Sequence, residues 1–409
     1  MKPLAIVGTA LFLLGGQETS LRELMERLQD DAIDAREEAA AELVRRGAAA
    51  LAPLREAIKS ASGERRLRLE EAVRRIEEKQ RVAAVLRPAT LVSVEATDRP
   101  LRQVLEELSK ASGTLIEWAN VPEDVRVTWR ASKLPFWEAL DEACRASGKF
   151  TYEVAQDRVR PVAGKHADFP RRAHGPFAIS LRQIEMRVRG DFGGGAPSEQ
   201  TSPRFVVCWE KGTQPDRVFL TPVEVRDDRG TDLLSRRRNV VAHHPEIARG
   251  HIAAPSLHLW INQVPDAEAT RLARLRFEVT VEFHLEFAGV SFRTGPAWAP
   301  STQPCEKFSA TLEKFSRDGN AAHLRLKITP VDGRREGIQA LKVRFTDKDG
   351  KVQQEPLGRH GSSRSGKAFT IASDLHLANL GEVIEISVVA PSRVHTEKID
   401  CDFKDIPIK

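Results

Sequence analysis

Histidine and carboxylate side chains gather in one short stretch of the sequence, HHPEIARGH, which holds His243, His244, Glu246 and His251. Imidazole and carboxylate groups are ligands that zinc prefers, so this stretch is a candidate metal site of a metal-dependent hydrolase. Its spacing departs from H-E-x-x-H, and Pro245 would break a helix that placed the ligands on one face. A turn with ordinary exposed histidines is the favoured interpretation. His258 and His284 lie in predicted strands, where only the fold decides whether they meet.

Other motifs indicate turns rather than reactive groups. DKDGK at 347–351 lacks the glycine and glutamate positions of a calcium loop and is typical of a hairpin turn. GDFGGG at 190–195 is not followed by the G-K-[ST] of a phosphate loop, and GRHGSSRSGK at 358–367 lacks G-x-S-x-G. The sequence therefore predicts no catalytic residues, no cofactor and no enzyme activity.

Four cysteines, Cys144, Cys208, Cys305 and Cys401, lie far apart, and none forms a C-x-x-C pair. This spacing argues against a zinc ribbon or a thioredoxin-type site. In an oxidising compartment Cys305 and Cys401 are the candidate disulfide pair, because both lie in the C-terminal region. Cys144 falls on the apolar face of a predicted helix, where a small buried residue is expected rather than a nucleophile.

The N-terminus MKPLAIVGTALFLLGG has one lysine followed by an apolar run from Leu4 to Leu14. This pattern predicts a signal peptide over residues 1–17 and export to the periplasm or the extracellular side of a bacterial envelope. A retained N-terminal anchor is the alternative. The run is too short to span a bilayer, and no later segment is apolar over a spanning length. With 63 basic and 58 acidic residues, the chain lacks the concentrated basic face of a nucleic-acid binder.

A chain of 409 residues is long for one core and suggests several domains. Residues 18–82 carry apolar stripes at helical spacing and predict helical hairpins. The phrase AREEAAAELVRRGAAALAPLREAI in this segment resembles HEAT-like repeats. The segment is too short for the three or so repeats of a self-supporting solenoid, so a cap or docking hairpin is expected. A short coiled coil is the alternative.

One phrase occurs twice at an offset of 35 residues, as PLRQVLEELSKASG at 100–113 and PFWEALDEACRASG at 135–148. A short alternating strand precedes each copy and another follows it. Proline near the start and glycine just after the end mark each copy as a helix. Residues 88–163 therefore predict a duplicated strand–helix–strand domain, in which two helices cover one sheet.

The pattern VSVEATDRPLRQVLEELSKASG, followed by VRVTWRASKLPFWEALDEACRASGKFTYEV, resembles the short N-terminal domain shared by secretins and TonB-dependent receptors, the STN domain. The resemblance implies an envelope protein-interaction domain without catalytic residues. Nothing downstream resembles the membrane barrel of those proteins, so a role in an outer-membrane pore does not carry over. Trp118, Trp129 and Trp137 cluster in this domain and form a candidate interaction surface. Trp137 lies off the main apolar stripe, where it would cover a partner or a neighbouring domain, or pack against the helical segment.

Residues 168–302 and 303–409 carry short alternating strands separated by turns, a pattern typical of antiparallel β-sandwiches. VEVRDDRG at 223–230 and VRFTDKDG at 343–350 resemble each other, which suggests two sandwiches of related design. The predicted fold class is therefore α+β and multidomain: helical hairpins, a duplicated βαβ domain and two antiparallel β-sandwich domains.

The function that these features predict is that of a non-catalytic, exported envelope protein that acts through protein–protein contacts. Addition of a partner strand to a sheet edge is one mechanism for such contacts. Two alternatives remain. One is a metal-dependent hydrolase at the His243–His251 stretch, and the other is a carbohydrate-binding or adhesive β-sandwich protein, suggested by the six tryptophans.

Overall fold

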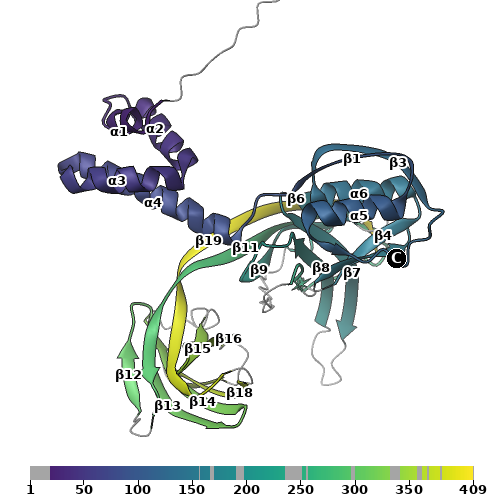
Figure 1. The fold of residues 1–409 in the computed structure, drawn as a ribbon. Coiled ribbons are helices and arrows are strands. Elements are labelled where there is room, and N and C mark those ends of the chain that lie inside the picture. Colours follow the sequence, from purple (N-terminus) through teal and green to yellow (C-terminus); the bar gives the residue numbers. More distant parts are fainter. Residues whose placement is uncertain are drawn as a thin grey trace, which may run out of the picture. The chain divides into compact units, whose positions relative to one another are not determined.

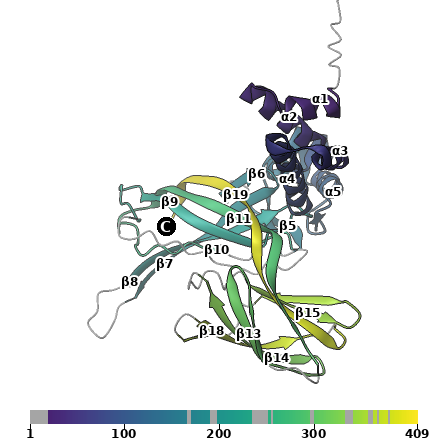
Figure 2. The same ribbon diagram turned by 90° about the vertical axis from the view of Figure 1, so that its left-hand side faces the viewer.

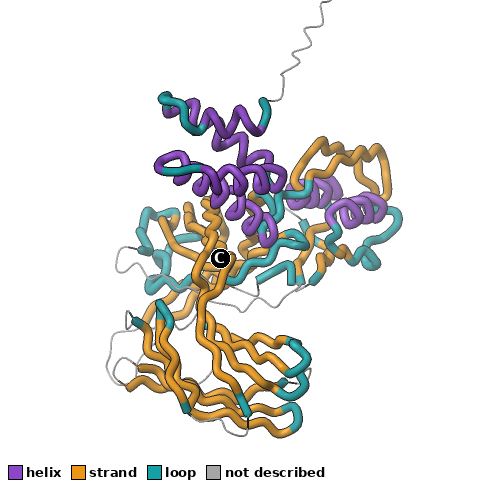
Figure 3. Tube along the Cα trace, turned by 60° about the vertical axis from the view of Figure 1, so that its left-hand side comes forward, coloured by secondary structure: helices purple, strands orange, loops and turns teal. Residues whose placement is uncertain are grey.

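The computed structural model of this chain describes residues 19–155, 157–165, 170–189, 198–234, 251–254, 257–295, 300–331, 341–356, 362–365, 368–377 and 380–408. The described residues form six α-helices and five mostly antiparallel sheets, so the predicted mixture of helices and antiparallel strands is confirmed. All six helices precede residue 148, and the described chain beyond it consists of strands and loops (Figure 3). The chain divides into two compact units, residues 1–84 and 85–409.

The N-terminal unit consists of helices α1 (Leu21–Arg27), α2 (Ile33–Arg46), α3 (Ala48–Ser60) and α4 (Gly63–Val85), the last of which ends one residue past the unit. Ser20 starts α1 with a capping box, since its hydroxyl accepts the Glu23 N–H and the Glu23 carboxylate accepts the Ser20 N–H. Buried leucines and alanines from all four helices form one cluster. None of the described helices is long and apolar enough to cross a membrane. The predicted signal peptide lies outside the described residues.

The repeated phrase builds repeated elements. Strand β1 (Leu91–Pro100), helix α5 (Leu101–Ser112) and strand β2 (Leu115–Ile116) recur 35 residues later as β3 (Arg126–Pro135), α6 (Phe136–Ser147) and β4 (Phe150–Val154), and β5 (Arg158–Ala163) completes the set. Each helix ends at a left-handed glycine, Gly113 with φ 66° and Gly148 with φ 62°. The offset seen in the sequence is therefore also the offset between equivalent structural elements.

These strands form two sheets, so the expectation of one sheet covered by two helices is wrong. Among the described strands β1 pairs only with β3, while β2, β5 and β4 form a three-stranded sheet. Helices α5 and α6 lie between the two sheets and contact strands of both (Figure 1). The physical reason is that the strands before the helices pair with each other, which leaves the strands after the helices to pair through β5.

An approximate two-fold axis relates the two copies. The first N–H of α5 (Leu101) donates to the carbonyl of Val125 at 2.8 Å, and the first N–H of α6 (Phe136) donates to the carbonyl of Thr90 at 2.9 Å. Asp98 and Lys133, 35 residues apart, both have positive φ. Their N–H groups donate to equivalent hydroxyls, those of Thr128 at 3.1 Å and Ser93 at 3.0 Å. The duplication thus extends to backbone strain and to the side chains that stabilise it.

The rest of the described chain forms three further sheets. Their strands are β6 (Arg171–His174), β7 (Phe177–Arg189), β8 (Ser198–Trp209), β9 (Arg217–Asp227), β10 (Leu257–His258), β11 (Arg271–Arg293), β12 (Ser301–Pro304), β13 (Phe308–Asp318), β14 (Ala321–Pro330), β15 (Lys342–Asp347), β16 (Val352–Pro356), β17 (Ser362–Ser365), β18 (Ala368–His376) and β19 (Val383–Pro407). The sheet orders are β10–β8–β7–β6, β12–β13–β14–β18–β17 and β16–β15–β19–β11–β9. The first two of these sheets share one strand order. In sequence order, β6, β7, β8 and β10 of the first sheet are neighbours in the same way as β12, β13, β14 and β18 of the second.

Two long antiparallel strands, β11 and β19, run through both β-rich regions (Figures 1 and 2). Phe277 near the start of β11 and Cys401 near the end of β19 lie in one hydrophobic cluster with residues of β7, β8 and β9. Phe292 near the end of β11 and Ile386 near the start of β19 lie in a second cluster with β13, β14 and β15. The C-terminal end of the chain therefore contributes to the core of residues 177–283, although in sequence it belongs to the segment 303–409.

The similar phrases at 223–230 and 343–350 form the same turn. Asp227 ends β9 and Asp347 ends β15, and each carboxylate accepts three backbone N–H groups. The donors are Arg229, Thr231 and Asp266 in the first turn, and Asp349, Lys351 and Gly381 in the second, all at 2.8–3.0 Å. Each turn then has a glycine with positive φ, Gly230 at 86° and Gly350 at 77°.

Asp347→Asn is expected to destabilise the protein at pH 7, because an amide cannot accept all three N–H groups as a carboxylate does. The N–H of Gly381 is the largest cause that holds the pKa of Asp347 below its ordinary 3.8. A lowered pKa means that this stabilisation is complete above pH 3.8 and is lost as the pH falls through the folded-state pKa. The difference in urea midpoint from wild type should therefore be large at pH 7 and smaller at pH 3. Asp349→Asn, an exposed change in the same turn, is the control, and an equal difference at both pH values would contradict the assignment.

Candidate functional site

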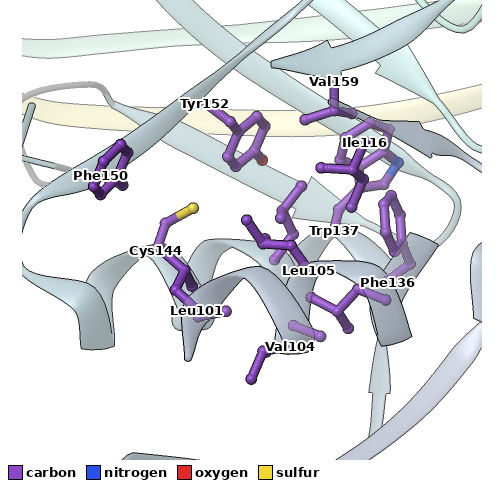
Figure 4. Packing of buried hydrophobic residues seen from close by; sticks show 14 of the residues in the cluster. Leu101, Val104, Leu105, Ile116, Phe136, Trp137, Cys144, Phe150, Tyr152 and Val159 are labelled. Atoms are coloured by element: carbon purple, nitrogen blue, oxygen red, sulfur yellow. The ribbon is translucent and has the colours of Figure 1, made fainter. Parts of the chain in front are cut away.

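The three tryptophans of the predicted interaction surface have different environments. Trp137 is fully buried, so of the environments predicted for it the accessible interaction surface is wrong. Its ring lies 4.9 Å from that of Phe136 and 6.2 Å from that of Tyr152 (Figure 4). Its Nε1 donates to the carbonyl of Pro176 at 3.0 Å. Helix α6 directs the indole toward the turn between β6 and β7, so that Trp137 covers the neighbouring β-rich segment.

Trp118 and Trp129 are half-buried and pack against the same hydrophobic cluster. Trp129 lies on β3, and its Nε1 donates to the Glu142 carboxylate at 2.9 Å. One part of each indole therefore packs against the hydrophobic cluster, and the other part stays accessible to solvent. They are the members of the predicted surface that a partner can still contact.

A buried polar cluster joins this domain to β6. The guanidinium of Arg171 lies 3.7 Å above the ring of Tyr152, and it also donates to the Tyr152 carbonyl. The Tyr152 hydroxyl donates to Asp141 at 2.8 Å, and Arg171 forms an ion pair with the same carboxylate at 3.5 Å. Burial raises the pKa of Tyr152 well above its ordinary value, so the phenol stays protonated. Since α6, β4 and β6 each supply one member, the cluster fixes the duplicated domain against the sheet that follows it.

The β1–β3 ribbon has one buried face and one exposed face. Val92, Val94 and Ala96 of β1 are buried, while the alternate residues face outward, including Leu91, which is 60% exposed. Glu95 lies opposite Arg130 on the outer face. Neither β1 nor β3 pairs with a third strand within the described residues. The ribbon therefore presents two strand edges to which a further strand can hydrogen-bond.

The edge formed by β3 is basic. Arg126, Arg130 and Lys133 are exposed along it. Arg126 lies 3.7 Å from Asp98, whereas the side chains of Arg130 and Lys133 form no ion pair in the described part of the chain. A partner strand with acidic side chains would find complementary charge there.

The predicted zinc stretch falls almost entirely outside the described residues, which exclude His243, His244 and Glu246. His251 is described, and its backbone carbonyl accepts the indole N–H of Trp209 at 2.8 Å. Among the described residues no group of three His, Cys, Asp or Glu side chains is placed to hold a metal ion. Zinc binding at this stretch stays a prediction, which metal analysis of the dialysed protein would test.

The cysteines are all free thiols. The predicted Cys305–Cys401 disulfide is not formed, because Cys401 lies in the core of the first β-rich region while Cys305 packs against the core of the second. Cys144 is a small buried residue of α6, as expected. Burial raises the pKa of Cys144, Cys208 and Cys401 to about 12, so these thiols are protonated at neutral pH.

The sequence did not reveal a charged cluster where β11 passes from one core to the other. Lys342 donates to Asp216 at 2.6 Å, and the same carboxylate accepts the backbone N–H of His284 at 2.8 Å. The His284 side chain is 1% exposed, and neither ring nitrogen forms a hydrogen bond within the described residues. No local signal could have found this cluster, because the three residues lie on separate segments far apart in sequence. His258, by contrast, stacks on Trp260 at 5.3 Å.

Burial lowers the pKa of His284 from 6.5 to about 4, with the Asp216 charge opposing the shift and the Lys342 charge adding to it. We expect the His284 ring resonance, assigned by its loss in His284→Gln, to titrate near pH 4 in an NMR pH series. Asp216→Asn should lower this midpoint and Lys342→Met should raise it. The neutral ring contributes stability that is complete above pH 6.5 and is lost as the pH falls toward 4. A midpoint near 6.5, or equal shifts in both variants, would contradict this arrangement.

The described geometry thus offers an anchored domain with an exposed two-stranded ribbon. A search of family models, of curated proteins and of solved structures finds no match to this chain. What the ribbon can do chemically is to form backbone hydrogen bonds and charge pairs with a strand of another molecule.

Proposed function

We propose that this protein is a non-catalytic, exported component of a bacterial envelope that assembles with a partner protein through its STN-like domain and β-sandwich domains. The observation that carries the proposal is the β1–β3 ribbon, whose inner face is buried by α5 and α6 and whose outer edges are free within the described residues. An unpaired edge of this kind is a template to which a strand of another chain can hydrogen-bond.

The way the domain is attached supports an assembly role. A docking module transmits force or position only if it is held rigidly by the rest of the protein. The indole of Trp137 and the guanidinium of Arg171 provide that attachment, the first to the β6–β7 turn and the second from β6 itself. These two attachments lie on the same side of α5 and α6 as β4, whereas the β1–β3 ribbon lies on the other side of the two helices (Figure 1).

The proposal includes two β-sandwich domains of related design. Its support is the recurrence of one strand order in two sheets, the matching hydrogen bonds of Asp227 and Asp347, and a separate hydrophobic cluster for each region. In this interpretation the two sandwiches share β11 and β19, so that each long strand belongs to both. The apolar run from Leu4 to Leu14 supports export.

Site-specific photocrosslinking in cells tests the proposal. A photoreactive residue at Glu95 or at Arg130, both outward on the ribbon, is expected to give one discrete adduct with a partner protein. The matched control is Lys110 on α5 of the same domain, whose side chain is 75% exposed. Absence of an adduct from both ribbon positions, or the same adduct from Lys110, would refute the ribbon as the docking surface. Loss of the Glu95 adduct in an Arg130→Glu background would indicate that the partner strand carries acidic side chains, since the substitution would repel them.

A further inference from the structure

Within the described residues, a second strand edge without a neighbour lies on β7, in the first β-rich region. Strand β6 pairs with only the first four residues of β7, from Phe177 to Ser180. Beyond them β7 continues to Arg189 and pairs with β8 on one side. On its other side the described residues provide no strand neighbour from Ile184 onward. The β7–β8 hairpin extends past the neighbouring strands as an arm (Figures 1 and 2).

This arm carries an apolar stripe that continues the core face of β7. Leu181 is buried in the core, a register shift follows it, and Ile184, Met186 and Val188 then occupy the same face. Their exposure rises along the strand, from half-buried Ile184 to 42% for Met186 and 64% for Val188. Large apolar side chains on an unpaired edge strand favour pairing with another strand.

We propose that two copies of this chain form a two-fold symmetric dimer, in which the free β7 edges pair antiparallel with Met186 opposite Met186. Under this symmetry the residue numbers of each opposing pair sum to the same value. Ile184 then lies opposite Val188, so the apolar stripes of the two copies join on one face. On the other face Glu185 lies opposite Arg187 in both halves of the interface, and each charge meets its opposite.

The charges select this register over its neighbours. Moving the two-fold axis by one residue to Glu185 would place that carboxylate opposite itself, and moving it to Arg187 would place two guanidinium groups together. Within one copy Glu185 and Arg187 already lie on the same face, with 2.7 Å between their charged groups. The edge is therefore complementary to itself. Pairing with a second copy of the chain requires this property, whereas pairing with an unrelated strand would not.

Disulfide trapping tests the pairing on residues 18–409, in a Cys305→Ser background that eliminates the half-buried thiol. Opposed residues of antiparallel strands have Cα atoms about 4.5–5.5 Å apart, within disulfide range. Met186→Cys is expected to form a covalent dimer under mild oxidation. Val188→Cys alone should not, but should form one when mixed with Ile184→Cys. Equal crosslinking of Val188→Cys alone and Met186→Cys would overturn the register.

Sedimentation over a concentration series tests the interface without crosslinks. So short an edge gives a small, transient interface, so dimer formation should appear at high protein concentration. Arg187→Glu is expected to weaken it at least about tenfold, since like charges then oppose each other in both halves. The charge-swapped double variant Glu185→Arg/Arg187→Glu restores the pairs and should return the dimer to wild-type affinity.

Three results would overturn the proposal. The first is a wild-type protein that sediments as a monomer at every concentration, and the second is a dimer that Arg187→Glu leaves unchanged. The third is adsorption of the monomer to phospholipid vesicles that Met186→Ser abolishes, which would assign the stripe to a lipid surface. None of these readouts needs a partner protein, so they are independent of the proposed role of the β1–β3 ribbon.

Discussion

Trp137→Ala is expected to lower the free energy of unfolding by about 3–5 kcal/mol, the range for truncating a fully buried aromatic side chain. The indole fills the space between α6, Tyr152 and the β6–β7 turn, and its removal would leave a cavity that a packed core cannot close. It would also remove one of the two N–H groups that the Pro176 carbonyl accepts, the other being the backbone N–H of Glu210 at 2.9 Å. Urea unfolding followed by far-ultraviolet circular dichroism measures the change.

Two variants separate the contributions of Trp137. Trp137→Phe keeps most of the apolar volume and removes the N–H, so it should cost less than Trp137→Ala. Trp118→Ala removes a half-buried indole of the same domain and should cost less still. If Trp118→Ala were as destabilising as Trp137→Ala, the assignment of Trp137 as the anchor of the domain would be wrong. Photocrosslinking from the ribbon should also fail in Trp137→Ala if rigid attachment matters for docking.

Gly289→Ala is expected to destabilise the pairing of β11 and β19 by more than about 3 kcal/mol, beyond the usual cost of overpacking. A Cβ at this position would lie 2.1 Å from the Val388 carbonyl oxygen and 2.8 Å from the Cα of Val389. Because both atoms belong to the backbone, no side-chain rotation can relieve the contact. The strands would have to separate where they enter the second core, so a loss of soluble protein and a lower urea midpoint are the expected readouts.

Gly319→Ala is the matched control for this substitution. Gly319 lies in a turn with φ 56°, and a Cβ there would meet nothing within 4 Å. Its substitution should cost only the strain of a left-handed alanine, about 1–2 kcal/mol. A Gly289→Ala variant no less stable than Gly319→Ala would show that the two long strands lie farther apart than the structure has them.

Local features of this protein could be predicted from its sequence because their causes are local. The helices at 101–112 and 136–147 begin after a proline and end at a glycine, and both signals act within a turn or two. The 35-residue repeat produced equivalent elements because each copy carries the same apolar stripe. The turns after Asp227 and Asp347 likewise follow from an aspartate that binds backbone N–H groups two and four residues ahead.

The candidate sites depended on contacts between segments far apart in the chain. Trp137 could be placed off the main stripe of its helix, but its indole N–H meets Pro176, which lies in the turn between β6 and β7. Cys305 and Cys401 both belong to the C-terminal segment of the sequence, but they are not close in space. The reason is that β19 returns to the first β-rich region, where Cys401 is part of the core. Asp216, His284 and Lys342 meet only because β11 crosses between the two cores.

By itself, then, the amino-acid sequence determined the helices, the repeat, the strand-forming segments and their turns, since periodicity and capping operate over a few residues. Only the tertiary structure decided that β1 pairs with β3 in a sheet of their own, and that β7 extends beyond β6. Which strand edges remain free depends on how all the strands share their hydrogen bonds, and each strand carries the same donors and acceptors whatever its neighbours. The surfaces proposed for binding are the edges left over from that pairing.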